Sequence, residues 1–471
     1  MGGLQFFRRG EVVQIEKFAP DTMLLDYLRL TEKSKGTKEG CNEGDCGACT
    51  VVLGTAHNGG VRYQAVNACI LLLGQIHGKE LITVDDLARD GKLHPVQRAM
   101  VDAHASQCGF CTPGFVMSLF SLAHEDRNVD RADVVDQIAG NLCRCTGYRP
   151  IIDAGLAACN SADDHWSRAQ AETSNILSDI DGDLFTGNET SFFAAPETAE
   201  KLAELCAQYP TATIVSGATD VGLWITKQMR MQSQIIYSGR AKDFATIEDH
   251  GDAVLIGAGA THTEVLETLR NLHPDLGELL RRFGSRQVRA SGTIGGNIAN
   301  GSPIGDMPPA LIALGARLHL RHGKNERVLK LEDFFIAYGK QDRKAGELVW
   351  RVDVPKPAAN QIFKCFKISK RFDDDISAVM GAFLLTVESS KIIAARIAFG
   401  GMAATPKRAY KTEAALIGKT LEEALSVTLD DYAPIADMRA SAEYRMTIGN
   451  ALLQKALMEA AGADDLRVIT P

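Results

Sequence analysis

The chain has 471 residues, of which 45% are hydrophobic and 23% charged, and its net charge is -8. These values are typical of a globular protein of about three domains and exclude intrinsic disorder as a general description. The acidic balance argues against nucleic-acid binding, and no apolar run approaches the ~20 residues that a membrane span needs. The first residues lack the apolar core of a signal peptide, so we expect a cytoplasmic protein.

The first third of the chain predicts two small structural units. Residues 4–17 alternate apolar and polar residues around Arg9-Gly10, which predicts a hairpin. A short helix, a glycine-rich loop and the strand 50–53 follow, so we expect a small α+β unit. Residues 84–160 carry apolar residues at three- and four-residue spacing, which predicts a bundle of four short helices.

The remaining sequence predicts a linker and two mixed layers. Residues 161–190 are polar and show no sustained period, which favours a linker. From residue 191 onwards predicted helices and strands alternate, with strands in TATIVSG, SQIIYSG and DAVLIGAGA. The last hundred residues predict a separate α/β layer, with two strands followed by helices at 411–427 and 443–461.

Cysteine is distributed unevenly along the chain. Nine of the eleven cysteines lie within the first 159 residues. Because disulfides are rare in the cytosol, such a local concentration indicates metal binding or redox chemistry. Eight of the cysteines form two candidate metal-binding sets, and the remaining three, Cys159, Cys206 and Cys365, are expected to be buried thiols. No two histidines stand at metal-ligand spacing.

The first cysteine set has the spacing of a plant-type 2Fe–2S site. Its ligands would be Cys41, Cys46, Cys49 and Cys69. The glycines between the first three permit positive φ and close backbone approach to sulfide. A structural zinc site is the alternative, but zinc sites favour paired short hooks, which this spacing does not have.

The second set consists of two pairs at predicted helix ends, and it is less diagnostic by itself. The pairs are Cys108 with Cys111, and Cys143 with Cys145. Two such hooks also suit zinc. Beside a first iron–sulfur motif, a second redox centre is the simpler interpretation.

Three segments resemble one known family. GCNEGDCGACTVVL, QCGFCTPGFVMS and NLCRCTGYRPI are similar to the iron–sulfur part of the xanthine dehydrogenase/aldehyde oxidase family of molybdenum hydroxylases. The similarity covers nearly the whole chain, whose organisation is most like that of the small subunit in two-subunit bacterial xanthine dehydrogenases.

The resemblance implies an α+β multidomain fold with two 2Fe–2S clusters, the second nearer the molybdenum. The implied parts are a ferredoxin-like β-grasp 2Fe–2S domain (1–80), a four-helix 2Fe–2S domain (81–160), a linker (161–190), an α+β FAD-binding domain (191–365) and a C-terminal α/β flavoprotein domain (366–471).

The family's flavin motifs are also present. A strand that enters a Gly-Ala-Thr turn offers backbone N–H groups to a pyrophosphate. A second segment places two adjacent glycines before an asparagine. By resemblance, the FAD-binding residues are Ile214, Val215, Ser216, Gly217, Ala218, Thr219, Asp220, Val221, Phe283, Thr293, Ile294, Gly295, Gly296, Asn297, Asp306, Val349 and Lys367. Gly257–Ala260 lacks the third glycine of a dinucleotide fingerprint, so we expect a tight turn there.

The resemblance further implies that NAD+ accepts the electrons near Asp220, Tyr338 and the loop 370–375, although these charged residues could also form a solvated turn. Hydroxylation would occur on a molybdopterin-binding large subunit, so no catalytic residue for it is expected here. The partner would contact the second-cluster domain, including Gln107, in a dimer of heterodimers.

Three alternatives remain at this point. The chain could serve a molybdenum hydroxylase with another substrate, such as an aldehyde, nicotinate or carbon monoxide. Oxygen could replace NAD+ as acceptor. A zinc-stabilised binding protein without redox activity would leave the flavin-like segments unexplained.

Overall fold

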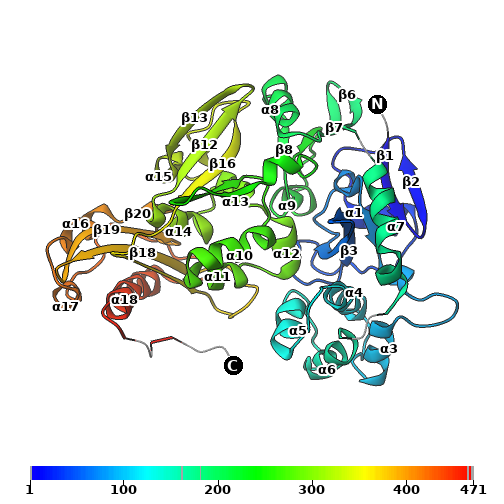
Figure 1. Ribbon diagram of the computed structural model, residues 1–471, viewed down its shortest axis with the longest axis horizontal. Coiled ribbons are helices and arrows are strands. Elements are labelled where there is room, and N and C mark those ends of the chain that lie inside the picture. Colours follow the sequence, from blue (N-terminus) through cyan, green and yellow to red (C-terminus); the bar gives the residue numbers. More distant parts are fainter. Residues whose placement is uncertain (1–2, 161–162, 181, 464–465, 468–471) are drawn as a thin grey trace. The chain divides into compact units, whose positions relative to one another are not determined.

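The computed structural model describes residues 3–160, 163–180, 182–463 and 466–467, and its contacts divide the chain into two units. The first unit contains the described residues up to Lys242 together with Gly284–Gly292, and the second contains Asp243–Phe283 and the described residues from Thr293 onwards. The boundary therefore falls inside the predicted FAD-binding region 191–365. Figure 1 shows the elements of both units.

The first unit begins with a five-stranded sheet in the order β2-β1-β5-β3-β4. Strands β1 and β2 form the predicted hairpin, with positive φ at Arg9 and Gly10 in its turn. The Asn58-Gly59 turn, also at positive φ, joins β3 to β4. The strands are β1 (Leu4–Arg8), β2 (Glu11–Ile15), β3 (Thr50–His57), β4 (Gly60–Asn67) and β5 (Glu80–Ile82), and the short helices are α1 (Leu24–Asp26), η1 (Tyr27–Thr31) and η2 (Leu73–Ile76).

A helical region follows, as predicted, but it contains five helices instead of the expected four, because residues 84–87 form an additional single turn. The region buries its apolar faces in one core. Pro95 and Pro113 lie in the first turns of two helices, where a missing N–H costs nothing. The fully buried Phe115 and Phe120 centre the core, which extends onto β3 and β4. The helices are α2 (Val84–Leu87), α3 (Pro95–Asp102), α4 (Thr112–Ala123), α5 (Arg131–Ile138) and α6 (Arg149–Ala158).

The predicted linker 161–190 contains a fifteen-residue helix, α7 (His165–Asp179), which packs against β3 and β4. Asp164 caps this helix by accepting a hydrogen bond from the Ser167 backbone N–H (2.8 Å). Its carboxylate also lies 2.7 Å from His94 Nε2 and 3.1 Å from His124 Nε2. Two histidines that are far apart in sequence thus anchor the start of α7 to the helical region.

The first unit also includes a four-stranded sheet in the order β6-β7-β9-β8 and the helix α12. The strand β8 leads into the first predicted flavin segment. The elements are β6 (Leu184–Asn188), β7 (Ser191–Ala195), α8 (Ala199–Gln208), β8 (Thr213–Val215), α9 (Val221–Thr226), β9 (Gln234–Tyr237) and α12 (Arg286–Ser291).

The second unit contains a five-stranded sheet in the order β10-β11-β16-β12-β13, a four-stranded sheet in the order β17-β18-β19-β20 and a two-stranded sheet of β14 and β15. The four-stranded sheet and α18 form the predicted C-terminal layer around one core. The remaining strands are β10 (Ile247–Asp249), β11 (Ala253–Gly257), β12 (Arg317–His322), β13 (Asn325–Lys330), β14 (Phe335–Ala337), β15 (Lys340–Gln341), β16 (Leu348–Pro355), β17 (Gln361–Ile368), β18 (Val379–Glu388), β19 (Lys391–Gly400) and β20 (Lys407–Arg408).

The helices of the second unit complete the α+β arrangement and confirm the predicted fold class. They are η3 (Lys242–Ala245), which starts at the unit boundary, α10 (His262–Leu272), α11 (Pro274–Arg281), α13 (Ile294–Asn300), α14 (Met307–Leu314), α15 (Leu331–Phe334), α16 (Tyr410–Leu416), α17 (Leu421–Ala424) and α18 (Ala442–Ala460). Among the described residues, no helix is long and apolar enough to cross a membrane.

Candidate cofactor sites

The first cysteine set converges at one end of the β3–β4 hairpin. Cys49 directly precedes β3 and Cys69 follows β4, and the pairing of Thr50 with Asn67 brings these ends together. The two Sγ atoms lie 3.2 Å apart, and both side chains are buried. The hairpin register, rather than sequence proximity, therefore places the fourth predicted ligand beside the third.

The other two thiols of this set lie across a tight loop. The backbone N–H of Cys41 donates to Cys46 Sγ (3.2 Å), and that of Cys46 donates to Cys41 Sγ (3.3 Å). A Cβ on Gly40 would stand 2.7 Å from Cys46 Sγ, so only glycine leaves room for this sulfur. Amide donors on sulfur and a loop without side-chain bulk suit thiolates that ligate iron.

The protonation of these thiols reflects their proximity. Hydrogen bonds from Cys46 and Cys69 lower the pKa of Cys41, and the same sharing raises the pKa of Cys46 and, with Cys49, that of Cys69. One thiolate is thus stabilised by its neighbours' protons. Iron binding would have to displace the other protons, as it does at any cysteine site.

The second cysteine set also comes together, in two pairs. Cys108 Sγ lies 3.7 Å from Cys145 Sγ, and Cys111 interacts with Cys143. Cys111 occupies the N-cap position of α4, whereas Cys143 and Cys145 lie in the loop between α5 and α6. The backbone N–H of Cys145 donates to Cys143 Sγ (3.4 Å), which also contacts Thr146 Oγ1 (3.3 Å).

This second set is more exposed than the first. Cys108 and Cys145 are exposed, whereas Cys143 is buried. Burial and the neighbouring Cys143 raise the pKa of Cys111 to about 12. Burial acts against ionisation at Cys143 too, but hydrogen bonds from Thr146 and Cys145 lower its pKa to about 7.

The thiols of the first set form one connected group, because Cys41 interacts with both Cys46 and Cys69, and Cys69 also interacts with Cys49. The second set consists of two interacting pairs. Four thiols in each set suit a binuclear iron–sulfur cluster, which takes two thiolates on each iron. Cys159, Cys206 and Cys365 are buried, as expected.

A backbone hydrogen bond joins the two cysteine loops. The N–H of Leu142 donates to the carbonyl oxygen of Cys46 (3.0 Å). Leu142 directly precedes Cys143, so one hydrogen bond and the covalent backbone connect a predicted ligand of each set. This link lies within the first unit.

The first predicted flavin segment, Ile214–Val221, runs from β8 into α9 in the first unit. Ala218 has a φ of +57° at the turn, which only a few side chains tolerate. A Cβ on Gly217 would lie 2.0 Å from the carbonyl oxygen of Ser291, so this close approach requires glycine. Burial raises the pKa of Asp220, although Trp224 Nε1 donates to its carboxylate (3.1 Å).

The second predicted flavin segment, Thr293–Asn297, begins α13 in the second unit. Thr293 caps the helix by accepting a hydrogen bond from the N–H of Gly296 (3.0 Å). The N–H of Gly295 donates to the Ala258 carbonyl (2.9 Å), and a Cβ at Gly295 would lie 2.3 Å from Ala258 Cβ. The Gly257–Ala260 turn therefore packs directly against this segment. The sequence predicted the turn but not this contact.

Asn297 provides a test of whether this segment suits a polar cofactor. Its Oδ1 atom is buried and has no hydrogen-bond partner among the described residues. A buried acceptor without a partner is costly, and a flavin donor group would satisfy it. The second segment thus fits the predicted cofactor.

The other predicted flavin residues occupy different surroundings in the second unit. Lys367 Nζ donates to Asp306 Oδ2 (2.6 Å), and both side chains are buried. Ser377 donates to the other carboxylate oxygen of Asp306. Phe283 lies 4.1 Å from the His262 ring, and Val349 is buried. The buried ion pair fixes Asp306 at the start of α14.

The predicted NAD+ residues are divided between the units. Asp220 lies in the first unit, whereas Tyr338 and the loop 370–375 lie in the second. Tyr338 is 75% exposed, and the backbone N–H of Arg371 donates to Asp375 (2.8 Å). The loop is therefore an ordered, exposed turn.

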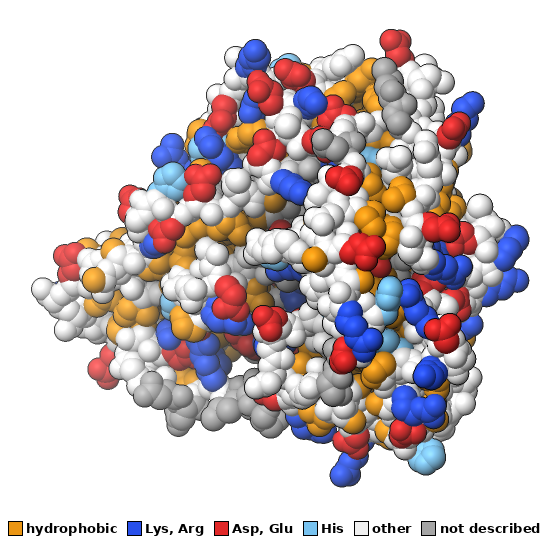
Figure 2. All heavy atoms as spheres, turned by 45° about the vertical axis from the view of Figure 1, so that its right-hand side comes forward, with side chains coloured by type: hydrophobic (Ala, Val, Ile, Leu, Met, Phe, Trp, Pro, Cys, Tyr) orange, Lys and Arg blue, Asp and Glu red, His pale blue; other side chains and the backbone are white. Residues whose placement is uncertain are grey.

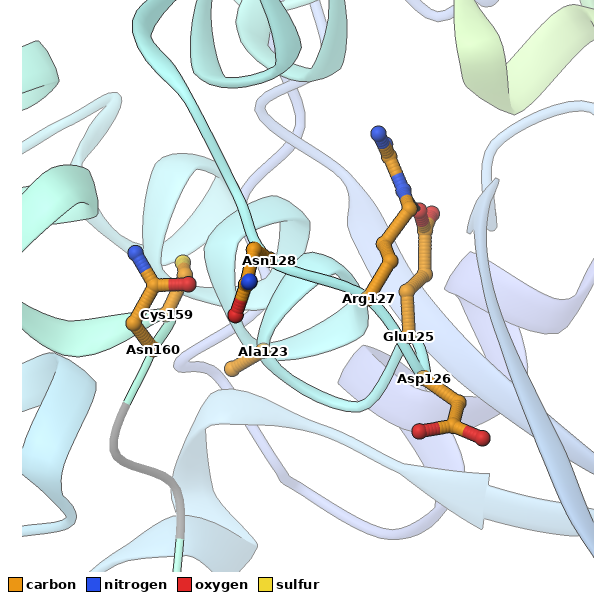
Figure 3. Close-up of a pocket in the computed structure, with 7 residues that line it drawn as sticks. All are labelled: Ala123, Glu125, Asp126, Arg127, Asn128, Cys159 and Asn160. Carbon is orange, nitrogen blue, oxygen red and sulfur yellow. Dashed lines mark hydrogen bonds and ion pairs between the residues drawn. The ribbon is translucent and has the colours of Figure 1, made fainter.

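A surface cavity of about 450 Å³ lies at the end of α4. Figure 3 shows Cys159 and Asn160 on one side, and Glu125 and Arg127 on the other. Arg127 pairs with Glu125, and Asn160 exchanges two hydrogen bonds with the backbone of Val129. None of the predicted site residues lines this cavity.

Four family models match successive parts of the chain. Residues 6–73 match a 2Fe-2S iron-sulfur cluster binding domain, and residues 83–156 match a second 2Fe-2S binding domain. Residues 188–357 match the FAD binding domain in molybdopterin dehydrogenase, and residues 364–460 match the CO dehydrogenase flavoprotein C-terminal domain.

Curated and solved proteins agree with these matches. Xanthine dehydrogenase 1 of Arabidopsis thaliana is 31% identical over 88% of this chain and 37% of its own length, so the chain spans little more than a third of that relative. Reconstituted CO dehydrogenase from Oligotropha carboxidovorans is 25% identical, covering 59% of this chain and 99% of the matched chain with a TM-score of 0.53. Quinoline 2-oxidoreductase from Pseudomonas putida 86 shares the fold, at 24% identity over 58% of this chain and 97% of its own, with a TM-score of 0.51.

These domains define an iron–sulfur flavoprotein of the oxidoreductase class. The chain belongs to the molybdenum hydroxylase family, and it carries that family's two 2Fe–2S domains and its flavin-binding domains.

Proposed function

We propose that the chain is the electron-transfer subunit of a xanthine dehydrogenase that uses NAD+. In this proposal, electrons from xanthine or hypoxanthine enter from the molybdopterin centre of a large partner subunit and leave to NAD+. The observation that carries the proposal is the link between two four-cysteine sets: the Leu142 N–H donates to the carbonyl oxygen of Cys46 (3.0 Å). Two thiol sites so connected suit a relay rather than two separate structural metals.

The proposed ligands of the first 2Fe–2S cluster are Cys41, Cys46, Cys49 and Cys69. Those of the second are Cys108, Cys111, Cys143 and Cys145. When bound, the clusters supply one-electron transfer and FAD converts between single electrons and hydride transfer. The protein's own contribution is to hold the thiolates, to donate backbone N–H groups to their sulfurs, and to exclude water around the buried first set.

The flavin contacts proposed for this chain lie in two segments. Backbone groups of Ile214–Val221 and Thr293–Asn297 would bind the diphosphate and ring of FAD, with the Asn297 amide oxygen as a polar anchor. The Lys367–Asp306 pair would fix a carboxylate near the flavin. Tyr338 and the exposed loop 370–375 would receive NAD+.

The exposed second set supports a partner on that side of the helical domain. Cys108 and Cys145 are exposed, and the side chain of Gln107, which precedes Cys108, donates to the carbonyl oxygen of Cys145 (3.0 Å). We propose that the molybdopterin-binding subunit covers this edge, in a heterotetramer within the cytoplasm. Figure 2 shows basic and acidic side chains interspersed over one face of the molecule.

An anaerobic titration of the purified chain with NADH tests the proposal. We expect NADH to bleach both the flavin absorption and the broad iron–sulfur absorption. Bleaching by dithionite but not by NADH would keep the cofactors and contradict NAD+ as acceptor. A protein that binds zinc and has no visible absorption after iron–sulfur reconstitution would contradict the redox function altogether.

A further inference from the structure

The helix α12 packs with the cysteine domains although the chain on either side of it belongs to the second unit. Arg286 pairs with Asp136 (2.7 Å) and Glu125 (2.6 Å), and Arg289 pairs with Asp136 (3.0 Å). These ion pairs hold α12 against the end of α4 and against α5. The residue that follows α12 and Gly292 is Thr293, the first residue of the second flavin segment.

One side chain of α12 enters the polar contact between the two cysteine domains. Gln287 is 1% exposed, and its Nε2 lies 3.1 Å from Asn141 Oδ1, 3.2 Å from Ser118 Oγ and 3.4 Å from Thr50 Oγ1. Thr50 belongs to the first-set domain, and the other two belong to the helical domain. A single amide therefore bridges both domains.

Asn141 continues this bridge to the cysteine loops. Its Nδ2 donates to the carbonyl oxygen of Gly47 (3.1 Å) and to Thr50 Oγ1 (3.3 Å). Gly47 follows Cys46, and Asn141 precedes Leu142, so the amide of Asn141 lies directly beside the Cys46–Leu142 hydrogen bond. A fixed orientation of the Asn141 side chain therefore holds in place the two loop segments whose backbones form this hydrogen bond.

The backbone around Gln287 and Asn141 is closely packed, so it has little room to shift if one of these side chains is altered. A Cβ on Gly47 would lie 2.2 Å from the Gly140 carbonyl oxygen, and one on Gly140 would lie 2.5 Å from Gln287 Oε1. Close packing of this kind transmits small displacements. Gln287 Oε1 itself is buried without a hydrogen-bond partner among the described residues, so the side chain carries a cost that its donor contacts must offset.

We propose that Gln287 is a positioning residue for electron transfer between the two proposed iron–sulfur sites, acting through Asn141 on the Cys46–Leu142 hydrogen bond. This inference rests on the proposed function. One electron passes between the sites, so one is oxidised as the other is reduced, and no bond breaks.

The test compares Gln287→Met with the matched control Gln137→Met in the full chain carrying iron and flavin. Methionine has a similar volume, removes the donor, and also removes the unpaired Oε1, so the fold should tolerate it. Gln137 is equally buried (1% exposed), donates to the Ser118 carbonyl (2.8 Å) and accepts from Arg286 of α12 (2.6 Å). Among the described residues, it has no hydrogen bond to Gly47, Thr50 or Asn141. Gln287→Asn, which keeps the amide on a shorter side chain, is a second test variant.

Two measurements distinguish positioning from general loosening. The hydrogen-exchange rate of the Leu142 amide reports how firmly the Cys46–Leu142 hydrogen bond is held. Pulse-radiolysis reduction followed by absorbance reports the rate of electron transfer between the two sites. We expect both Gln287 variants to exchange this amide faster and to transfer electrons about tenfold more slowly, the lower range for residues that orient metal ligands. Both midpoint potentials should stay at their wild-type values.

Three results would overturn the inference. They are wild-type exchange and transfer in the Gln287 variants, equal slowing in Gln137→Met, and slowing fully explained by shifted potentials. Failure of the proposed function would appear differently, because the wild-type chain would then hold no pair of iron–sulfur centres to compare.

Discussion

The two cysteine regions differ in how far the protein encloses them. In the first, Cys49 and Cys69 are 2% and 1% exposed at the end of the β3–β4 hairpin. In the second, Cys108 is exposed in the loop before α4 and Cys145 in the loop between α5 and α6, and only Cys143 is buried among the four. The first cysteine region is therefore enclosed by a sheet and its core, whereas the second lies at the surface of the helical domain.

This difference suits a chain that would pass electrons between a partner protein and a buried site of its own. A buried site is protected from solvent and its properties are set by its own domain. An exposed site leaves part of its surface for a partner. The backbone hydrogen bond from Leu142 to Cys46 joins the two sites, so an electron that enters at the exposed site would have a short path to the buried one.

Removing one ligand from each region should have the largest effect. We expect Cys69→Ser and Cys145→Ser each to lose about half of the bound iron, because each set would hold one 2Fe–2S cluster. Cys69→Ser should also lower the melting temperature, since its side chain is buried, whereas Cys145→Ser should change it little. Iron and sulfide analysis with thermal melting measures both effects. Cys206→Ser, a buried thiol in α8, should keep its iron; equal loss there would contradict the assignment.

One methyl group added to each cysteine loop tests how closely the two loops are packed. Gly47 has a φ of +66° and a Cβ there would lie 2.2 Å from the Gly140 carbonyl oxygen, whereas Gly109 has a φ of +82° with nothing within 4 Å. We expect Gly47→Ala to lower the free energy of unfolding by about 3 kcal/mol or more, and Gly109→Ala by about 1 kcal/mol from backbone strain alone. Urea unfolding followed by iron–sulfur absorption provides the values. Equal losses would show that the two loops are equally crowded.

A charge change at the exposed edge should affect the partner and not the cofactors. Arg144 is exposed between two cysteines of the second set. Arg144→Glu should weaken binding of the molybdopterin-binding subunit about tenfold while leaving the iron content unchanged. The control is Lys324→Glu in the exposed turn between β12 and β13, which makes the same change of charge elsewhere. Binding that is weakened equally by both variants would count against this edge as the interface.

The smallest expected effect concerns a buried carboxyl on β5. Burial raises the pKa of Glu80 to about 7, although hydrogen bonds from Tyr63 and Trp166 act in the opposite direction. The folded protein therefore binds more protons than the unfolded chain between about pH 4.5 and pH 7, and its stability falls as pH rises through that range. Glu80→Gln should remove this part of the pH dependence, as measured by melting at pH 5 and pH 8.

The control for that measurement is Glu11→Gln, an exposed carboxylate on β2. It should melt with the same pH dependence as the wild type. An unchanged pH dependence in Glu80→Gln would mean that the carboxyl titrates alike in the folded and unfolded chains.

Much of the fold could be predicted because local patterns determine it. The Arg9-Gly10 hairpin, the proline-started helices and the C-terminal strands all follow from residues close together in sequence. The 161–190 region could not be predicted in this way. The helix α7 presents few large apolar residues, chiefly Trp166 and Leu177, and depends on a capping carboxylate held by two distant histidines.

The candidate sites were predictable to the same extent. Cysteine spacing identified both sets, but it could not show that the β3–β4 register places Cys49 beside Cys69. Nor could it reveal the Lys367–Asp306 pair, whose members are 61 residues apart, or Gln287, which reaches Asn141 from 146 residues away. Long-range contacts of this kind leave no periodic signal in the sequence.

The proposed function requires this chain to hold two different iron–sulfur centres. Electron paramagnetic resonance of the dithionite-reduced protein, together with iron analysis, can show both centres separately. We predict two distinct 2Fe–2S signals of equal intensity, with one lost in Cys69→Ser and the other in Cys145→Ser. A single signal lost in both variants, or bound zinc with no signal after iron–sulfur reconstitution, would contradict the account.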